Sequence, residues 1–184
     1  MVRAGRFVSM ERLNALVDEF SKARVVVVGD LVIDEYIFGT TERISREAPV
    51  PVVREEKREI RLGGAGNVVA NIRALGGKPR PVGIVGVDEM GRQLLDDLMA
   101  SSGISIDGIA VDPSRFSTTK TRILAGGQNA VRQQMLRIDR VTGERVGPTV
   151  RRTLVDYIRR ALEGADALVV SDYGEGVVEG EVFD

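Results

Sequence analysis

The sequence predicts an α/β fold, a doubly wound and mainly parallel sheet with a small antiparallel flap inserted after its first strand. Short runs of β-branched residues, typical of strands buried on both faces, alternate with segments of helical periodicity. Strands that alternate with helices favour a parallel sheet. Since such sheets bind ligands beyond the carboxyl ends of their strands, we expect the functional site at that edge.

The first elements are read from apolar periodicity. Ser9 can cap a helix over residues 10–22, whose apolar side chains recur on one face. Four consecutive valines at 25–28 predict the first buried strand, which Gly29 and Asp30 close. Residues 31–62 are short, partly alternating segments interrupted by prolines, which confine strands to edges or irregular positions. We interpret them as the flap.

From residue 63 onward the alternation of helix and strand becomes regular. A glycine-rich turn opens a helix that ends at a pair of glycines, and Pro148 stands where a helix tolerates proline, near its start. The predicted elements are helices at 64–75, 90–102 and 148–164, and strands at 81–86, 104–111, 118–139 (with a turn at 126–127) and 167–170. Residues 182–184, which end at Asp184, resemble the start of another helix.

Composition narrows the class of function. A hydrophobic content of 43% in 184 residues favours one packed domain over disorder. A net charge of −1 and an aromatic content of 4% give no reason to expect a nucleic-acid partner. No apolar run approaches the roughly 20 residues that span a bilayer, and the first residues lack the apolar stretch of a secretory signal, so we expect no membrane association.

The chain contains neither cysteine nor histidine. Disulfides, thiolate nucleophiles, Ser-His-Asp triads and Cys/His metal sites are therefore excluded. The remaining chemistry must use carboxylates, lysine, arginine, hydroxyls, backbone amides or an oxygen-bound cation such as Mg²⁺. The lack of cysteine also suits a cytoplasmic protein.

The glycine turn is the most informative local motif. It reads Leu62-Gly63-Gly64-Ala65-Gly66-Asn67, and it could present the free amides of a helix N-terminus to a ligand. It could equally be a tight turn with no ligand. No Gly-Lys-Ser/Thr follows it, as a P-loop requires, and Val69 stands where a dinucleotide fingerprint has glycine or alanine.

Charged residues mark the predicted strand ends. Asp30 and Asp34 follow the first strand and Asp172 follows the last, and such carboxylates can accept hydrogen bonds from sugar hydroxyls. The alternative is that Asp30 caps a turn and Asp34 is merely solvated. Lys120 and Arg122 are two residues apart, so a strand places both on one face.

The same spacing recurs at Arg137 and Asp139. The planar guanidinium of arginine suits phosphate, which makes a phosphate site one interpretation of these strands. Paired charges on an exposed strand face are the other interpretation.

Together these residues resemble the ribokinase/phosphofructokinase-B family of sugar kinases. The resemblance rests on Gly-Asp-x-x-x-Asp at 29–34, the glycine-rich segment 63–67, and the glycines Gly76 and Gly86. Within the family, the segments 43–53, 119–122, 133–139 and 171–174 resemble bacterial D-glycero-β-D-manno-heptose-7-phosphate kinases in particular. Val69 and Glu175 depart from that pattern, which has a small residue and a lysine there.

The resemblance implies a ribokinase-like fold and a reaction. ATP with Mg²⁺ would phosphorylate the anomeric hydroxyl of D-glycero-β-D-manno-heptose 7-phosphate to the 1,7-bisphosphate, in the synthesis of ADP-heptose for lipopolysaccharide. The family's Gly-Ala-Gly-Asp base motif and Asn-x-x-Glu segment do not occur in these 184 residues. The resemblance therefore places the catalytic aspartate beyond Asp184, and no catalytic or metal residue is assigned within the chain.

From the same two missing motifs we expect the whole of residues 1–184 to be the sugar-binding part of one kinase domain. The chain would be truncated before the ATP-binding half of that domain, and it would be inactive alone.

The resemblance also implies roles for individual residues. The candidate sugar-binding residues are Asp34, Gly63, Gly64, Asn67 and Asp172. Lys120, Arg122 and Arg137 are candidates for the 7-phosphate, and Asp30 for a sugar contact or a structural role. The flap should cover the sugar and form a homodimer with its copy. Alternatives are a kinase for another sugar or sugar phosphate, and a non-catalytic module for sugar-phosphate binding or dimerisation.

Overall fold

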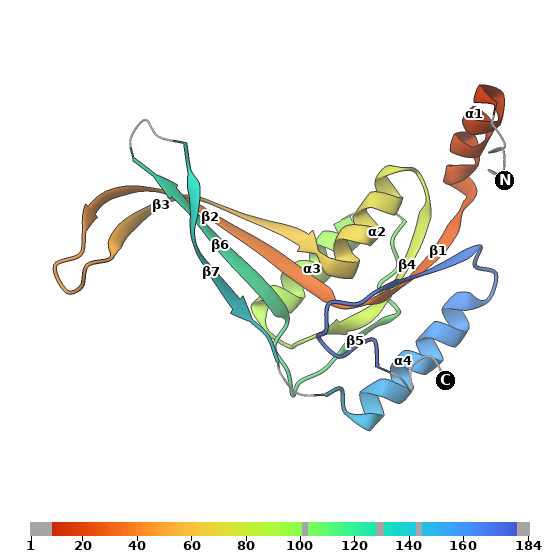
Figure 1. Ribbon diagram of the computed structural model, residues 1–184. Helices are drawn as coiled ribbons and strands as arrows, with labels where there is room; N and C mark the ends of the chain where they lie inside the picture. Colours follow the sequence, from red (N-terminus) through yellow and green to blue (C-terminus); the bar gives the residue numbers. More distant parts are fainter. Residues whose placement is uncertain (1–8, 101–102, 128–130, 143–144, 180–184) are drawn as a thin grey trace, which may run out of the picture.

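A four-stranded parallel sheet forms the centre of the computed structural model (Figure 1). The structure describes residues 9–100, 103–127, 131–142 and 145–179. The helix start predicted at 182–184, Asp184 included, lies outside the described residues. The strand order is β5-β4-β1-β8. The strands are β1 (Arg24–Gly29), β4 (Lys78–Val85), β5 (Ile109–Val111) and β8 (Ala167–Ser171).

Helices cover both faces of this sheet, as the valine run of β1 predicts. Val26 and Val28 pack in one cluster with α4 (Pro148–Leu162), through Leu154 and Ile158. Val27 points the other way, into a cluster with α2 (Gly64–Ala74) and α3 (Glu89–Ala100). Alternate side chains of one strand therefore fill two separate cores, which is the three-layered arrangement of a doubly wound sheet.

A second sheet of four strands projects to one side of the central sheet (Figure 1), and we call it the lid. Its order is β3-β2-β6-β7, and the strands are β2 (Leu31–Ile44), β3 (Pro51–Gly63), β6 (Thr118–Gly126) and β7 (Gln133–Arg140). The predicted flap at about 31–62 accounts for β2 and β3. The structure adds β6 and β7, and because β6 runs parallel to β2 the lid is mixed rather than antiparallel.

Two further elements differ from the expectation. Only residues 109–111 of the predicted strand 104–111 are extended in a sheet, because the Ser105 hydroxyl bonds both the carboxylate (2.7 Å) and the backbone N–H (3.2 Å) of Asp107 in a local turn. The first helix, α1 (Met10–Glu19), is capped by Ser9 as predicted, with the Ser9 hydroxyl accepting from Arg12 N–H at 3.2 Å. It is shorter than the predicted helix over residues 10–22, because a 3-10 turn, Phe20–Lys22, follows it. None of its residues is buried.

The central sheet ends at β8, where the apolar residues Leu168 and Val170 stay 41% and 45% exposed. Across the part of the chain that the structure describes, the helices are too short or too polar to cross a bilayer.

Candidate functional site

The candidate site lies where the lid leaves the central sheet, and strand register decides which residues it gathers. Asp34 of β2 pairs laterally with Lys120 of β6 and with Arg61 of β3. Laterally paired residues point to the same side of a sheet, so these three share a face. The same rule places Tyr36, Arg122, Arg137 and Asp139 on that face. We call these seven residues the charged lid face.

Arg122 is held in place by two neighbours on the charged lid face. Its guanidinium donates to the Asp34 carboxylate at 2.5 Å, and the two side chains are only 23% and 22% exposed. The hydrogen bond from Arg122 to Asp34 raises the pKa of Arg122, so this cation stays charged. Its Cζ also lies 5.3 Å from the ring centre of Tyr36, and Arg61 lies at the same distance from that ring. An acid and an aromatic ring therefore fix the guanidinium.

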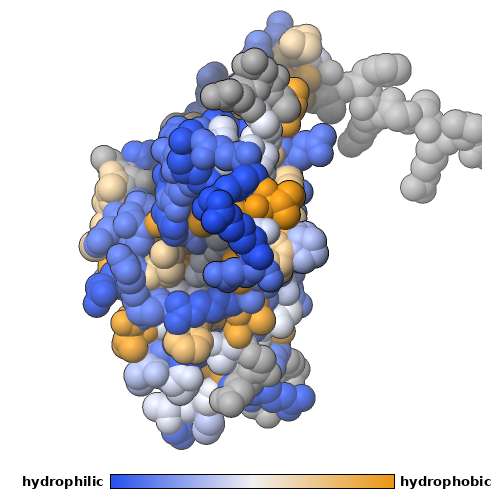
Figure 2. Space-filling model, turned by 90° about the vertical axis from the view of Figure 1, so that its left-hand side faces the viewer, coloured by the Kyte–Doolittle hydropathy of each residue, from blue (hydrophilic) through white to orange (hydrophobic). Residues whose placement is uncertain are grey.

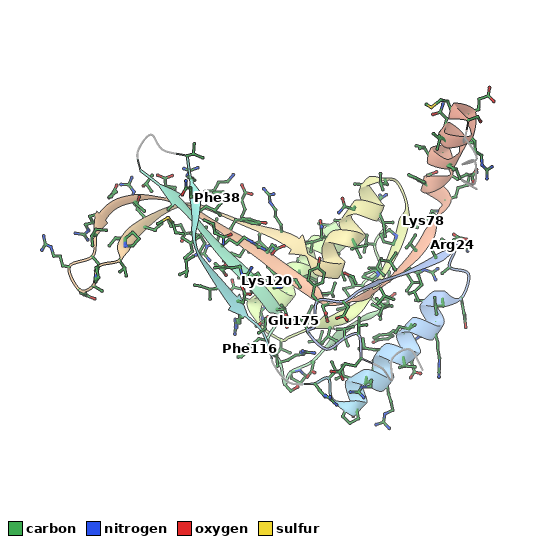
Figure 3. All side chains as sticks on the ribbon, viewed as in Figure 1. Arg24, Phe38, Lys78, Phe116, Lys120 and Glu175 are labelled. Carbon is green, nitrogen blue, oxygen red and sulfur yellow. The ribbon has the colours of Figure 1, made fainter. Side chains whose placement is uncertain are left out.

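Lys120 connects the charged lid face to the loop that follows β8. Its ammonium lies 5.5 Å from the ring centre of Tyr173. Figure 3 shows Lys120 and Glu175 close together where the lid meets the central sheet. Arg137, by contrast, is exposed on β7, pairs with Asp139 at 2.9 Å and lies opposite Arg122 in the register. The three predicted phosphate-binding cations therefore lie on one face. Two-residue spacing predicts this for Lys120 and Arg122, and the pairing of β6 with β7 adds Arg137.

The glycine turn brings the start of α2 against the beginning of β2. A Cβ on Gly63 would lie 2.5 Å from the Asp34 carboxylate oxygen. Gly64 has a φ of +53°, and a Cβ there would overlap the carbonyl oxygen of Asp30. No side chain caps the amides of this helix end, which leaves that part of the ligand-binding interpretation open. Asn67 is exposed in the first turn, with its oxygens accepting from the Asn71 amide.

Asp30 and Asp172 occupy different environments. The Asp30 side chain is buried, and its carboxylate accepts hydrogen bonds from the backbone of the loop after β8. That geometry agrees with the structural alternative for this residue. Asp172 is exposed, and one of its oxygens accepts from Gly174 N–H at 2.8 Å. Among the described residues none donates a hydrogen bond to the other oxygen of Asp172, so this oxygen can accept one from a hydroxyl group.

Sequence reasoning did not identify three residues of this region, Tyr36, Arg61 and Tyr173. Tyr36 follows Asp34 by two residues, so strand alternation could have placed it on the same face. Arg61 reaches the site only through strand pairing, and local sequence holds no signal for it. Tyr173 stands next to Asp172 in the segment 171–174, but its position against Lys120 depends on how the loop after β8 folds.

Glu175, at the position where the family resemblance leads us to expect lysine, gives a prediction about pH. Burial raises the pKa of Glu175, against the lowering effect of Lys120, and the Asp30 carboxylate adds to the rise. Because the folded protein then holds this proton more tightly than the unfolded chain, stability falls as pH rises from the ordinary value of 4.5 through the raised pKa.

We therefore expect Glu175→Gln to raise the free energy of unfolding by a small amount at neutral pH, and by nothing below pH 4.5. Urea denaturation of both proteins at the two pH values measures this difference. A gain of equal size at both pH values would show that the carboxylate charge is not its cause.

Comparison with known structures concerns the fold. The chain is similar to phosphofructokinase-2 from Escherichia coli in complex with substrates and products, at a TM-score of 0.61 and 14% identity, covering 85% of this chain and 47% of that one. It is also similar to a putative phosphofructokinase from Staphylococcus aureus, at a TM-score of 0.60 and 15% identity, covering 86% and 46%. At these identities the likeness concerns the fold alone, and it confirms the predicted ribokinase-like α/β fold.

Sequence comparison then gives the family. Residues 22–140 match the model of the pfkB family carbohydrate kinases, and the chain belongs to that family. The bifunctional protein HldE of Geobacter sulfurreducens is 43% identical over 171 residues, covering 92% of this chain and 34% of that protein. HldE of Desulfatibacillum aliphaticivorans is 42% identical over 159 residues, covering 86% and 31%. The chain thus spans about a third of the length of these relatives.

Proposed function

We propose that this chain is the sugar-binding part of an ATP-dependent kinase for D-glycero-β-D-manno-heptose 7-phosphate, which phosphorylates the anomeric hydroxyl to the 1,7-bisphosphate. The observation that carries the proposal is the charged lid face, where Arg122 and Lys120 lie beside the carboxylate of Asp34. A sugar phosphate needs both cations for its phosphate and hydrogen-bond acceptors for its hydroxyls. Membership of the pfkB family and the resemblance of segments 43–53 and 119–122 support this reading.

The residues take the following roles in the proposal. Asp34 and Asp172 accept hydrogen bonds from sugar hydroxyls. Gly63, Gly64 and Asn67 at the start of α2 contact the sugar, whereas the Ala65 N–H between them is already bonded to the Asp30 carbonyl. Arg122, Lys120 and Arg137 bind the 7-phosphate. Arg122 donates to Asp34 with one of its nitrogens, and a guanidinium has five N–H donors, so others remain for phosphate oxygens.

ATP would supply the phosphoryl group with Mg²⁺. Among the described residues no group of three or more acidic side chains could hold a metal ion. Following the family resemblance, the proposal assigns no Mg²⁺ ligand to this part of the protein. The family's base motif does not occur in the sequence either, and the proposal keeps the catalytic aspartate beyond Asp184. Asp184 itself lies outside the described residues and receives no role. The part of the reaction proposed for this chain is therefore to bind and orient the sugar phosphate.

The test is a binding measurement. In isothermal titration calorimetry we expect heptose 7-phosphate to bind at least about tenfold more tightly than the same heptose without its phosphate, because hydrogen bonds to charged groups contribute roughly 1.5–3 kcal/mol each. Equal affinity for both sugars would contradict a phosphate site on the lid. Tighter binding of another sugar phosphate from a panel would keep the kinase and change its substrate.

We also propose a homodimer formed through the lid, in the cytoplasm. The lid projects from the central sheet, and its outer strand β7 exposes Leu136 and Ile138 at 54% and 51%. Viewed toward the lid end, the surface is largely hydrophilic with small separate hydrophobic patches (Figure 2). Light scattering of the chain and of a Leu136→Asp, Ile138→Asp variant tests this, since a dimer held by these residues should become monomeric.

A further inference from the structure

Asp30 stands at the junction between the two sheets. It is the single residue between the end of β1 and the start of β2, so the lid begins directly after it. Its backbone N–H donates to the Ser171 carbonyl of β8 at 3.1 Å, and its carbonyl accepts from Ala65 N–H of α2 at 2.9 Å. One residue therefore connects the central sheet, the lid, and the first turn of α2.

The carboxylate of Asp30 binds the loop that follows β8. One oxygen accepts from the backbone N–H groups of Tyr173 at 2.8 Å and Glu175 at 3.2 Å, and the other from Val177 N–H at 3.1 Å. The intervening residues, Gly174 and Gly176, have φ values of +78° and +93°. Left-handed residues at alternate positions let N–H groups converge in an anion-binding concavity. Here the protein's own carboxylate fills that concavity.

A buried carboxylate is costly unless hydrogen bonds replace its water. Asp30 is only 1% exposed, and its three backbone bonds supply that replacement, because charge-assisted bonds of this kind are the stronger ones. Its strongest attachments therefore all go to residues 173–177, the segment that carries the Tyr173 ring against Lys120. The concavity is also unavailable to a substrate phosphate, which leaves that role to the cations of the charged lid face.

We propose that Asp30 is a positioning residue that holds the loop 172–177 at a fixed place relative to the lid, so that Asp172 and Lys120 face the same sugar phosphate. This inference rests on the proposed function for its ligand. It assigns to Asp30 no contact with the substrate. The carboxylate acts through the loop, and the lid keeps its place because β2 begins at the next residue.

The experiment uses Asp30→Asn, which keeps the shape of the side chain but turns an NH₂ group toward backbone N–H donors. By hydrogen exchange, we expect the amides of Tyr173, Glu175 and Val177 to exchange at least about tenfold faster, while paired amides of β1 and β4 stay protected. We expect heptose 7-phosphate to bind at least about tenfold more weakly, since a released loop must be ordered again on binding.

Asp112→Asn is the matched control. Asp112 is also buried, at 4% exposure, and its carboxylate accepts from the N–H (2.9 Å) and the hydroxyl (2.6 Å) of Ser114, in a turn after β5. This variant removes the same chemistry from a neighbouring turn, whose Arg115 donates to the Glu175 carbonyl at 2.9 Å, and it leaves the three bonds of Asp30 to the loop intact. It should leave both the exchange of residues 173–177 and the sugar-phosphate affinity unchanged.

Three results would overturn the inference: unchanged exchange in the loop of Asp30→Asn, equal loss of protection across the whole central sheet, and unchanged affinity despite a released loop. If the variant does not fold, hydrogen exchange of the wild-type protein tests the inference instead. The amides of Tyr173, Glu175 and Val177 must then exchange more slowly than the amide of Gly176, and equal rates would overturn the inference. Failure of the wild type to bind heptose 7-phosphate would refute the proposed function. The exchange rates of the loop would still show whether Asp30 holds the loop in place, because they do not depend on the ligand.

Discussion

Replacing Gly64 by alanine is expected to lower the free energy of unfolding by about 3–5 kcal/mol. The left-handed conformation at φ +53° costs a residue with a Cβ roughly 1–2 kcal/mol. The new methyl group would also overlap the carbonyl oxygen of Asp30, so the start of α2 must move. The hydrogen bond that the Ala65 N–H donates to this carbonyl is then lost, and overlap and lost bond together cost about 2–3 kcal/mol more. Guanidinium denaturation followed by circular dichroism measures the loss.

Gly103→Ala separates the two causes. Gly103 has a φ of +87°, also in the left-handed region, but a Cβ there meets no heavy atom within 4 Å. Only the conformational cost of roughly 1–2 kcal/mol remains. An equal loss of unfolding free energy in the two variants would show that the close approach of α2 to Asp30 contributes nothing to stability.

The central sheet could be predicted because its signals are local. Four consecutive valines fill both cores of a three-layered fold, and Pro148 and Ser9 mark helix starts by their own chemistry. Only two of the four lid strands, β2 and β3, were predicted to form one flap. These two strands are neighbours in sequence, whereas the ion pair between Asp34 and Arg122 joins residues 88 positions apart. Parallel pairing over such a distance leaves no trace in local periodicity.

The candidate site, like the lid, could be predicted only in part. Spacing alone places Lys120 and Arg122 on one strand face, and the structure confirms that geometry. Whether Arg122 pairs with a carboxylate or binds phosphate was left open by the sequence. The structure gives a more specific arrangement, because the carboxylate that Arg122 contacts is Asp34, itself a predicted sugar ligand. Residues read as separate candidates thus form one unit.

For that unit we expect Arg122→Ala to weaken the binding of heptose 7-phosphate at least about tenfold. A hydrogen bond to a charged group contributes roughly 1.5–3 kcal/mol, and about 1.4 kcal/mol corresponds to one decade in affinity. The variant also leaves Asp34, whose side chain is only 22% exposed, without its cation, which lowers the stability of the lid. In an assembled kinase, the KM for the sugar phosphate should rise and the KM for ATP should stay nearly constant.

Arg58→Ala is the control for Arg122→Ala, because it removes a comparable ion pair from the other side of the same lid strand. Arg58 of β3 bonds Glu35 of β2, and Glu35 follows Asp34 directly, so its side chain points to the opposite face. This variant should lose lid stability without losing affinity for the sugar phosphate. If calorimetry instead gives Arg122→Ala the affinity of the wild type while circular dichroism shows it folded, Arg122 is a structural partner of Asp34 and the phosphate binds elsewhere.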